Sequence, residues 1–134
     1  MSRSVRTPST KTILVVDDSS SVRQQLRFVL QNAGYPILEA YGGAHALHVV
    51  DQCKVALVIS DLNMPHLNGM ELLQRLKPRE RAIPFLMLTV DRNAELVDQA
   101  RRAGAAGWIV KPFKADVLVS TVHKLLRTDS APRL

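Results

Sequence analysis

The chain has 134 residues, 46% of them hydrophobic and 22% charged, which is the size and composition of one globular domain. Its single cysteine, Cys53, excludes an internal disulfide, and we expect it to pack as a small hydrophobic residue. No apolar run approaches the roughly 20 residues of a membrane-spanning helix, and the start lacks the apolar segment of a signal peptide. These features predict a cytoplasmic protein that does not insert into a membrane.

The net charge of +6 would suit a nucleic-acid-binding protein, so its location along the chain matters. Three of the excess charges belong to residues 1–11 and another to residues 127–134. No recognition-helix pattern, aromatic platform or zinc-finger spacing accompanies them. We therefore expect flexible tails over residues 1–10 (the basic one) and 128–134, a folded domain over 11–127, and no nucleic-acid partner.

Short apolar runs alternate with longer helical patterns, which is typical of a parallel sheet covered by helices. The runs predict strands at residues 12–16, 37–38, 55–59, 83–88 and 108–110. Helices are expected over about 19–33, 44–52, 69–77, 93–103 and 115–127. Gly34 and Gly104 stand where a residue in the left-handed conformation would end the first and the fourth helix.

Pro36 fixes the place of the second strand. A proline cannot donate to a sheet ladder, so this strand is expected at an edge. With right-handed crossovers, the remaining strands then follow in the order 2-1-3-4-5. The sequence thus predicts an α/β protein with a doubly wound, five-stranded parallel sheet of the flavodoxin-like type.

Polar residues stand at the C-terminal ends of four predicted strands. Asp17 and Asp18 follow the first strand, Asp61 follows the third, Thr89 ends the fourth, and Lys111 follows the fifth. Ligands of open parallel sheets bind beyond these ends, near the point where the strand order reverses, so we expect the five residues to converge. Adjacent carboxylates repel one another unless a cation neutralises them, and an all-oxygen site suits Mg²⁺.

Asp61 is the predicted nucleophile, because a carboxylate is ionised near neutral pH and can form an acyl phosphate without a general base. Thr89 can donate a hydrogen bond to one phosphoryl oxygen and Lys111 can pair with another, which matches the demands of phosphoryl transfer. The chain lacks a G-x-x-x-x-G-K-[ST] nucleotide loop. A phosphodonor must therefore supply the group, and we predict a phosphoryl acceptor rather than a turnover enzyme.

The segments around these residues resemble the receiver domains of two-component response regulators, especially the single-domain chemotaxis type. They are ILVVDD at 13–18, SDLNMP at 60–65 with Gly69, LMLT at 86–89 and GWIVKPF at 107–113. Chemotaxis receivers share the strand order given above, so that order is not independent of the resemblance. The resemblance implies a signalling domain phosphorylated by a histidine kinase or a phosphotransfer protein, with a further protein as output partner.

The resemblance also implies roles on the metal side of the site. Asp61 would be the phosphoacceptor and a metal ligand. Asp17 and Asp18 would hold Mg²⁺, one of them through water, and Asn63 would contribute its backbone carbonyl. The roles of Asp17, Asp18 and Asp61 agree with the prediction made from the strand ends alone, whereas that of Asn63 is implied by the resemblance only.

Further roles concern the switch. Thr89 would be the switch hydroxyl, Lys111 would pair with the phosphoryl group, and the bond before Pro112 would be cis. Trp108 stands at the position of the switch aromatic. Phosphorylation would draw in Thr89, let Trp108 turn inward, and change the face formed by the fourth helix, the fifth strand and the fifth helix. A monomer or a weak dimer through this face is expected.

Two residues depart from the usual receiver pattern. Val90 stands where a small residue is usual, so access to Asp61 is expected to be narrower. Asp91 adds a carboxylate near the entrance, where it would influence the lifetime of the phosphorylated state or, as we rather expect, cap the following helix. Two alternatives stay open: a degenerate receiver that binds proteins without being phosphorylated, and an Asp-nucleophile phosphohydrolase, which would need Asp in place of Asn63.

Overall fold

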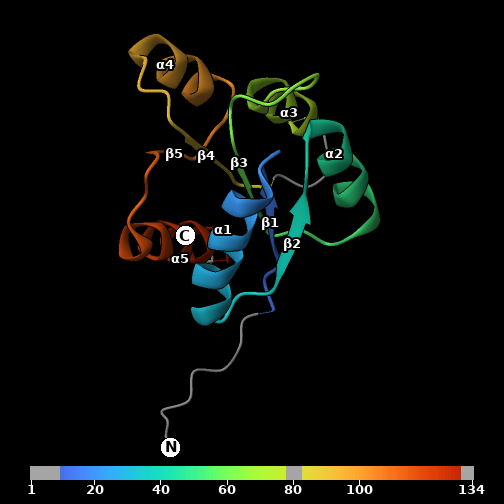
Figure 1. Cartoon of the computed structure of the whole chain (residues 1–134), viewed down its shortest axis with the longest axis vertical. Helices are drawn as coiled ribbons and strands as arrows, with labels where there is room; N and C mark the ends of the chain where they lie inside the picture. Colours follow the sequence, from blue (N-terminus) through green and yellow to red (C-terminus); the bar gives the residue numbers. More distant parts are fainter. Residues whose placement is uncertain (1–9, 78–82, 131–134) are drawn as a thin grey trace, which may run out of the picture.

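The computed structural model describes residues 10–77 and 83–130. In this part of the chain, one five-stranded parallel sheet has the predicted order β2-β1-β3-β4-β5, and five helices surround it (Figure 1). The strands are β1 (Ile13–Val16), β2 (Ile37–Ala40), β3 (Leu57–Ser60), β4 (Phe85–Thr89) and β5 (Gly107–Val110). The helices are α1 (Ser20–Asn32), α2 (Gly43–Gln52), α3 (Gly69–Leu76), α4 (Ala94–Arg102) and α5 (Ala115–Ser130).

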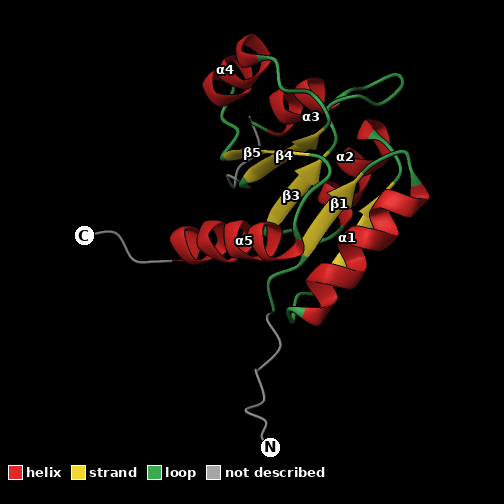
Figure 2. Cartoon of the chain, turned by 60° about the vertical axis from the view of Figure 1, so that its left-hand side comes forward, coloured by secondary structure: helices red, strands yellow, loops and turns green. Residues whose placement is uncertain are grey.

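Each face of the sheet has its own hydrophobic core, because successive strand residues point to opposite faces. Leu14 and Val16 of β1 pack with residues of α2 and α3, whereas Ile13 and Val15 pack with residues of α1 and α5. Figure 2 shows α1 and α5 together on one side of the sheet. Burial on both faces explains the nearly continuous apolar runs of β1, β3 and β4.

Local signals in the sequence set several element boundaries as predicted. The Ser19 hydroxyl accepts the N–H of Val22 and caps α1. Gly34 and Gly104 have φ values of 97° and 107° and lie directly after the C-caps of α1 and α4. Pro36 precedes β2, which is an edge strand.

Two local predictions were wrong. Asn93, not Asp91, caps α4, because its side chain accepts the N–H groups of Glu95 and Leu96. Asp91 instead accepts the N–H of Asn93 within the loop that precedes the helix. Cys53 is exposed rather than packed; it is the C-cap of α2 and lies in the connection between this helix and β3.

The C-terminal helix is longer than predicted. It continues to Ser130, beyond the expected boundary at Arg127, and the sequence offers no glycine or proline to stop it before Pro132. The rest of the predicted tail, residues 131–134, lies outside the described residues, as do residues 1–9 of the predicted N-terminal segment. None of the helices in the described part has the length and hydrophobicity to span a bilayer.

Candidate functional site

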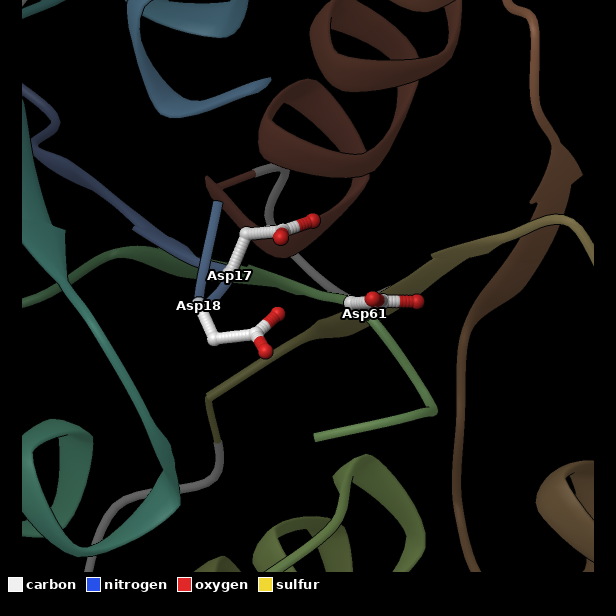
Figure 3. A group of neighbouring side chains, drawn as sticks. All are labelled: Asp17, Asp18 and Asp61. Carbon is white, nitrogen blue, oxygen red and sulfur yellow. The ribbon is translucent and has the colours of Figure 1, made fainter. Parts of the chain in front are cut away.

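Three carboxylates meet at the C-terminal edge of the sheet (Figure 3). One oxygen from each of Asp17, Asp18 and Asp61 lies within 4.8 Å of the others. Adjacency of β1 and β3 brings them together, since these strands pair in a register that places Val16 opposite Ser60, one residue before each acidic segment. The structure thus unites the acidic residues that the strand ends predicted.

Asp17 is held at all four of its polar atoms. Its N–H donates to the carbonyl of Ala40 at 3.1 Å, and its carbonyl accepts from Arg23 Nη1 at 2.7 Å. Its Oδ1 accepts the N–H of Ser19 at 2.9 Å, and its Oδ2 accepts from Lys111 Nζ at 2.9 Å. With 3% of its side chain exposed, Asp17 has a fixed orientation.

Lys111 places its ammonium group between two carboxylates. Its Nζ lies 2.9 Å from Asp17 Oδ2 and 3.6 Å from Asp61 Oδ2. Burial raises the pKa of Asp61; the Lys111 ammonium opposes this, and the charge of Asp17 adds to it. The Lys111 backbone N–H donates to the Thr89 carbonyl, and the bond from Lys111 to Pro112 is cis, as predicted.

Asp61 makes close contacts with residues of the loop that follows β3. The Ser60 hydroxyl donates to the Asp61 carbonyl at 2.8 Å, and the N–H of Asn63 donates to Asp61 Oδ1 at 3.4 Å. Gly69, the first residue of α3, lies against the same carbonyl, so a Cβ there would overlap its oxygen and lie 2.9 Å from Leu62 Cα. Only glycine fits this approach without displacing the backbone.

The β4–β5 side of the site contains the predicted switch residues. Thr89 is fully buried, and its hydroxyl accepts the N–H of Asp91 at 3.3 Å. The indole Nε1 of Trp108, which is half-buried, donates to the Asp91 carbonyl at 3.0 Å. Val90 is 65% exposed next to Thr89. Both predicted switch residues are therefore hydrogen-bonded to the backbone of Asp91.

The donor set fits Mg²⁺. Three carboxylates against one ammonium leave two negative charges in excess, and all nearby ligand atoms are oxygens, which this cation prefers. Asp18 and the loop residue Asn63 are exposed, so the cluster is open to solvent on one side. Asp17, Asp18, Asp61 and the carbonyl of Asn63 are the residues that could hold the ion.

Two residues at the site were not predicted from the sequence. Ser60 donates to the carbonyl of Asp61, and its position directly before the nucleophile was the available signal. Arg23 donates to the carbonyl of Asp17. Its place in the first turns of the helix that follows Asp18 was the corresponding signal, but an arginine there has many conceivable partners.

The family model of the response regulator receiver domain matches residues 13–123. The chain belongs to this family. It is 34% identical over 116 residues to the chemotaxis protein CheY of Pseudomonas aeruginosa, covering 84% of this chain and 94% of that protein. To CheY1 of Helicobacter pylori it is 36% identical over 121 residues, covering 87% and 98%.

Solved structures agree with this assignment. Chemotaxis protein CheY4 of Vibrio cholerae matches with a TM-score of 0.81 at 35% identity, over 87% of this chain and 99% of that one. The predicted family and fold are thereby confirmed, and the acidic cluster lies in a receiver domain of a two-component response regulator.

Proposed function

We propose that this protein is a cytoplasmic, phosphorylation-dependent signalling receiver that accepts a phosphoryl group on Asp61 from a histidine kinase or a phosphotransfer protein. One observation carries the proposal: Asp61 stands at an open sheet edge with the Lys111 ammonium 3.6 Å away and two further carboxylates beside it. Membership in the receiver family supports the choice of donor. The protein acts as an acceptor, not as a turnover enzyme.

The chemistry follows from the residues around Asp61. An ionised carboxylate oxygen of Asp61 attacks the phosphorus atom, a P–O bond forms, and the bond to the donor nitrogen or oxygen breaks with its electron pair leaving on the donor. Asp17, Asp18, Asp61 and the Asn63 carbonyl would hold Mg²⁺, which when bound neutralises charge on the phosphoryl oxygens. Lys111 pairs with one of these oxygens and the Thr89 hydroxyl donates to another.

The conformational change that follows phosphorylation occurs at the end of β4 and in β5. When the Thr89 hydroxyl donates to a phosphoryl oxygen, it is drawn from its present place beside the N–H of Asp91. Because Trp108 is bonded to the carbonyl of Asp91, displacement of this loop reaches β5. The face formed by α4, β5 and α5 then changes and binds an output protein, with the receiver a monomer or a weak dimer.

Val90 and Asp91 adjust the reaction at the entrance. Val90 narrows the approach to Asp61, so small phosphodonors react more slowly than they would past an alanine. The Asp91 carboxylate accepts the N–H of Asn93, so we expect its effect on the lifetime of the phosphorylated state to come from holding the loop.

The test is Mg²⁺-dependent phosphorylation by a small phosphodonor such as acetyl phosphate, with intact mass and Trp108 emission followed together. Wild type should gain one phosphoryl group and change its emission, and both changes should vanish in Asp61→Asn and without magnesium. No added mass, even with a competent histidine kinase, would instead identify a degenerate receiver that signals by binding alone. Continuous release of phosphate from many donor molecules would identify a phosphohydrolase.

A further inference from the structure

A partly buried ionic cluster joins α1 and β2 next to Asp17. Glu39 accepts from Arg23 Nε at 2.9 Å through one oxygen and from Arg27 Nε at 2.6 Å through the other. Arg23 uses a second nitrogen, Nη1, to donate to the carbonyl of Asp17 at 2.7 Å. A planar guanidinium can hold both contacts at once, which a lysine ammonium at the end of a flexible stem cannot reproduce.

The cluster is firmly placed. Glu39 lies opposite Val15 in the β1–β2 ladder, and the side chains of Arg23 and Glu39 are 16% and 26% exposed. Hydrogen bonds from Arg27 and Arg23 lower the pKa of Glu39, although its partial burial acts in the opposite direction. The carboxylate therefore stays charged and remains an acceptor for Arg23.

The carbonyl that Arg23 holds matters for Asp18. It belongs to the peptide that joins Asp17 to Asp18, and a planar peptide leaves little freedom once its carbonyl direction is fixed. Asp17 has other contacts that orient it. The exposed Asp18 carboxylate has no hydrogen bond or ion pair within the described residues, so its direction depends on this peptide.

We propose that Arg23, anchored by Glu39, is a positioning residue of the metal site: it sets the plane of the Asp17–Asp18 peptide and so aims the Asp18 carboxylate at the cation. This inference rests on the proposed function, because it assigns Arg23 a role in the magnesium site of the receiver. Arg23 does not touch the ion or the phosphoryl group and acts only through the backbone.

Charge and positioning predict opposite effects, which makes the role testable. A cation near a magnesium site weakens metal binding by repulsion, so removing the charge of Arg23 would by itself strengthen binding. A substitution that keeps the charge and removes the planar fork isolates the positioning effect. Arg27→Lys is the matched control, because Arg27 shares the same helix and the same Glu39 partner but has no described contact with Asp17.

The experiment is a titration of the unphosphorylated full chain with Mg²⁺ alone, read by calorimetry and by the amide resonance of Asp18. We expect Arg23→Lys to raise the dissociation constant about tenfold, as is usual when a residue that orients a metal ligand is altered. The dissociation constant of Arg27→Lys should stay within about twofold of the wild-type value, because Arg27 does not orient a metal ligand. Urea unfolding of both variants reports any general loss of stability.

Wild-type affinity in Arg23→Lys, or equal weakening in both variants, would overturn the positioning role. If Arg23→Lys does not fold, Glu39→Asp takes its place, because it keeps the charge and withdraws the carboxylate by one methylene. It should then weaken Mg²⁺ binding, and unchanged binding would overturn the inference. A wild-type chain that binds no Mg²⁺ would contradict the proposed function as well, so the two failures are distinguishable.

Discussion

The two sides of the proposed phosphoryl site differ in how firmly the fold holds them. On the β1–β3 side, both strands are buried throughout, and Asp17 is bonded at its N–H, its carbonyl and both carboxylate oxygens. On the β4–β5 side, β4 is buried throughout as well, but β5 is only half-buried, and Ala100 is the one fully buried residue of α4. Figure 1 shows α4 at the periphery of the molecule.

Under the proposed function, this difference would separate the residues that carry out the chemistry from those that change conformation. Phosphoryl transfer requires groups held in a fixed geometry, which the buried and bonded side supplies. A segment with few buried contacts changes conformation at low free energy. We therefore expect one new hydrogen bond at Thr89 to alter β5 and α4 while β1 and β3 stay in place. Substitutions on the firm side should have the larger effects.

Removing the ammonium between the two sides should have the largest effect. We expect Lys111→Gln to slow phosphorylation by a small phosphodonor about 100-fold, the usual loss when one group that stabilises a transition state is removed. The same variant should bind Mg²⁺ more tightly, since no ammonium competes for Asp17 and Asp61. Intact mass against time gives the rate. The control is Lys114→Gln, which changes an exposed lysine of the same loop and should be phosphorylated at the wild-type rate.

A rate for Lys111→Gln within a few-fold of wild type would mean that the ammonium does not act on the phosphoryl group. Weaker Mg²⁺ binding in this variant would show that Lys111 organises the carboxylates instead of competing with the ion for them.

Disturbing the packing under Asp61 should cost stability. Gly69→Ala would force a Cβ into the Asp61 carbonyl and the Leu62 backbone, and we expect it to lower the free energy of unfolding by about 2–3 kcal/mol. Gly42→Ala is the matched control: nothing lies within 4 Å of a Cβ there, and its φ of −177° suits any residue. Urea unfolding measures both, and equal losses would contradict the close approach at Gly69.

The charge of Asp61 should make the metal-free protein sensitive to pH. Burial raises the pKa of Asp61 in the folded chain, although Lys111 opposes the rise. The folded chain therefore binds this proton more tightly than the unfolded chain. The stability linked to this proton is fully present below the unfolded pKa and is lost as the pH rises through the folded pKa.

Asp61→Asn should consequently be more stable than wild type at neutral pH in the presence of a chelator. The gain should shrink as the pH falls toward about 4, the ordinary range of an aspartate pKa. Urea unfolding of both proteins across this range checks the sign, and a gain that grows toward acid pH would contradict the raised pKa.

Near the end of β4, a smaller effect is expected. Val90→Ala should speed reaction with a small phosphodonor a few-fold, because we propose that this exposed valine narrows the approach to Asp61. Val117→Ala removes the same atoms from an exposed position on α5 and should leave the rate unchanged. Equal rates for Val90→Ala and wild type would exclude a role in access.

Much of the fold was predictable because its signals are local. Apolar runs mark strands covered on both faces, and Pro36 places β2 at the edge. Once the order of the strands is known, the residues at their ends must share one rim, so Asp17 and Asp61 follow from topology. The cis bond before Pro112 came instead from the resemblance to receivers.

What the sequence did not predict depends on three-dimensional choices between similar groups. Aspartate and asparagine both cap helices readily, and the path of the loop decides that Asn93 rather than Asp91 caps α4. The contact from Arg23 to the Asp17 carbonyl depends on the pairing of β1 with β2, which presents Glu39 to the same guanidinium. Spacing and composition alone do not decide either contact.

Amide hydrogen exchange of the magnesium-loaded protein, before and after phosphorylation, tests the division between the two sides most directly. We predict that exchange changes in the segment from the end of β4 through β5, residues 89–110, and stays constant in β1 and β3. The same treatment of Asp61→Asn should change neither region. Equal changes on both sides, or changes confined to β1 and β3, would contradict the separation of a fixed chemical side from a mobile signalling side.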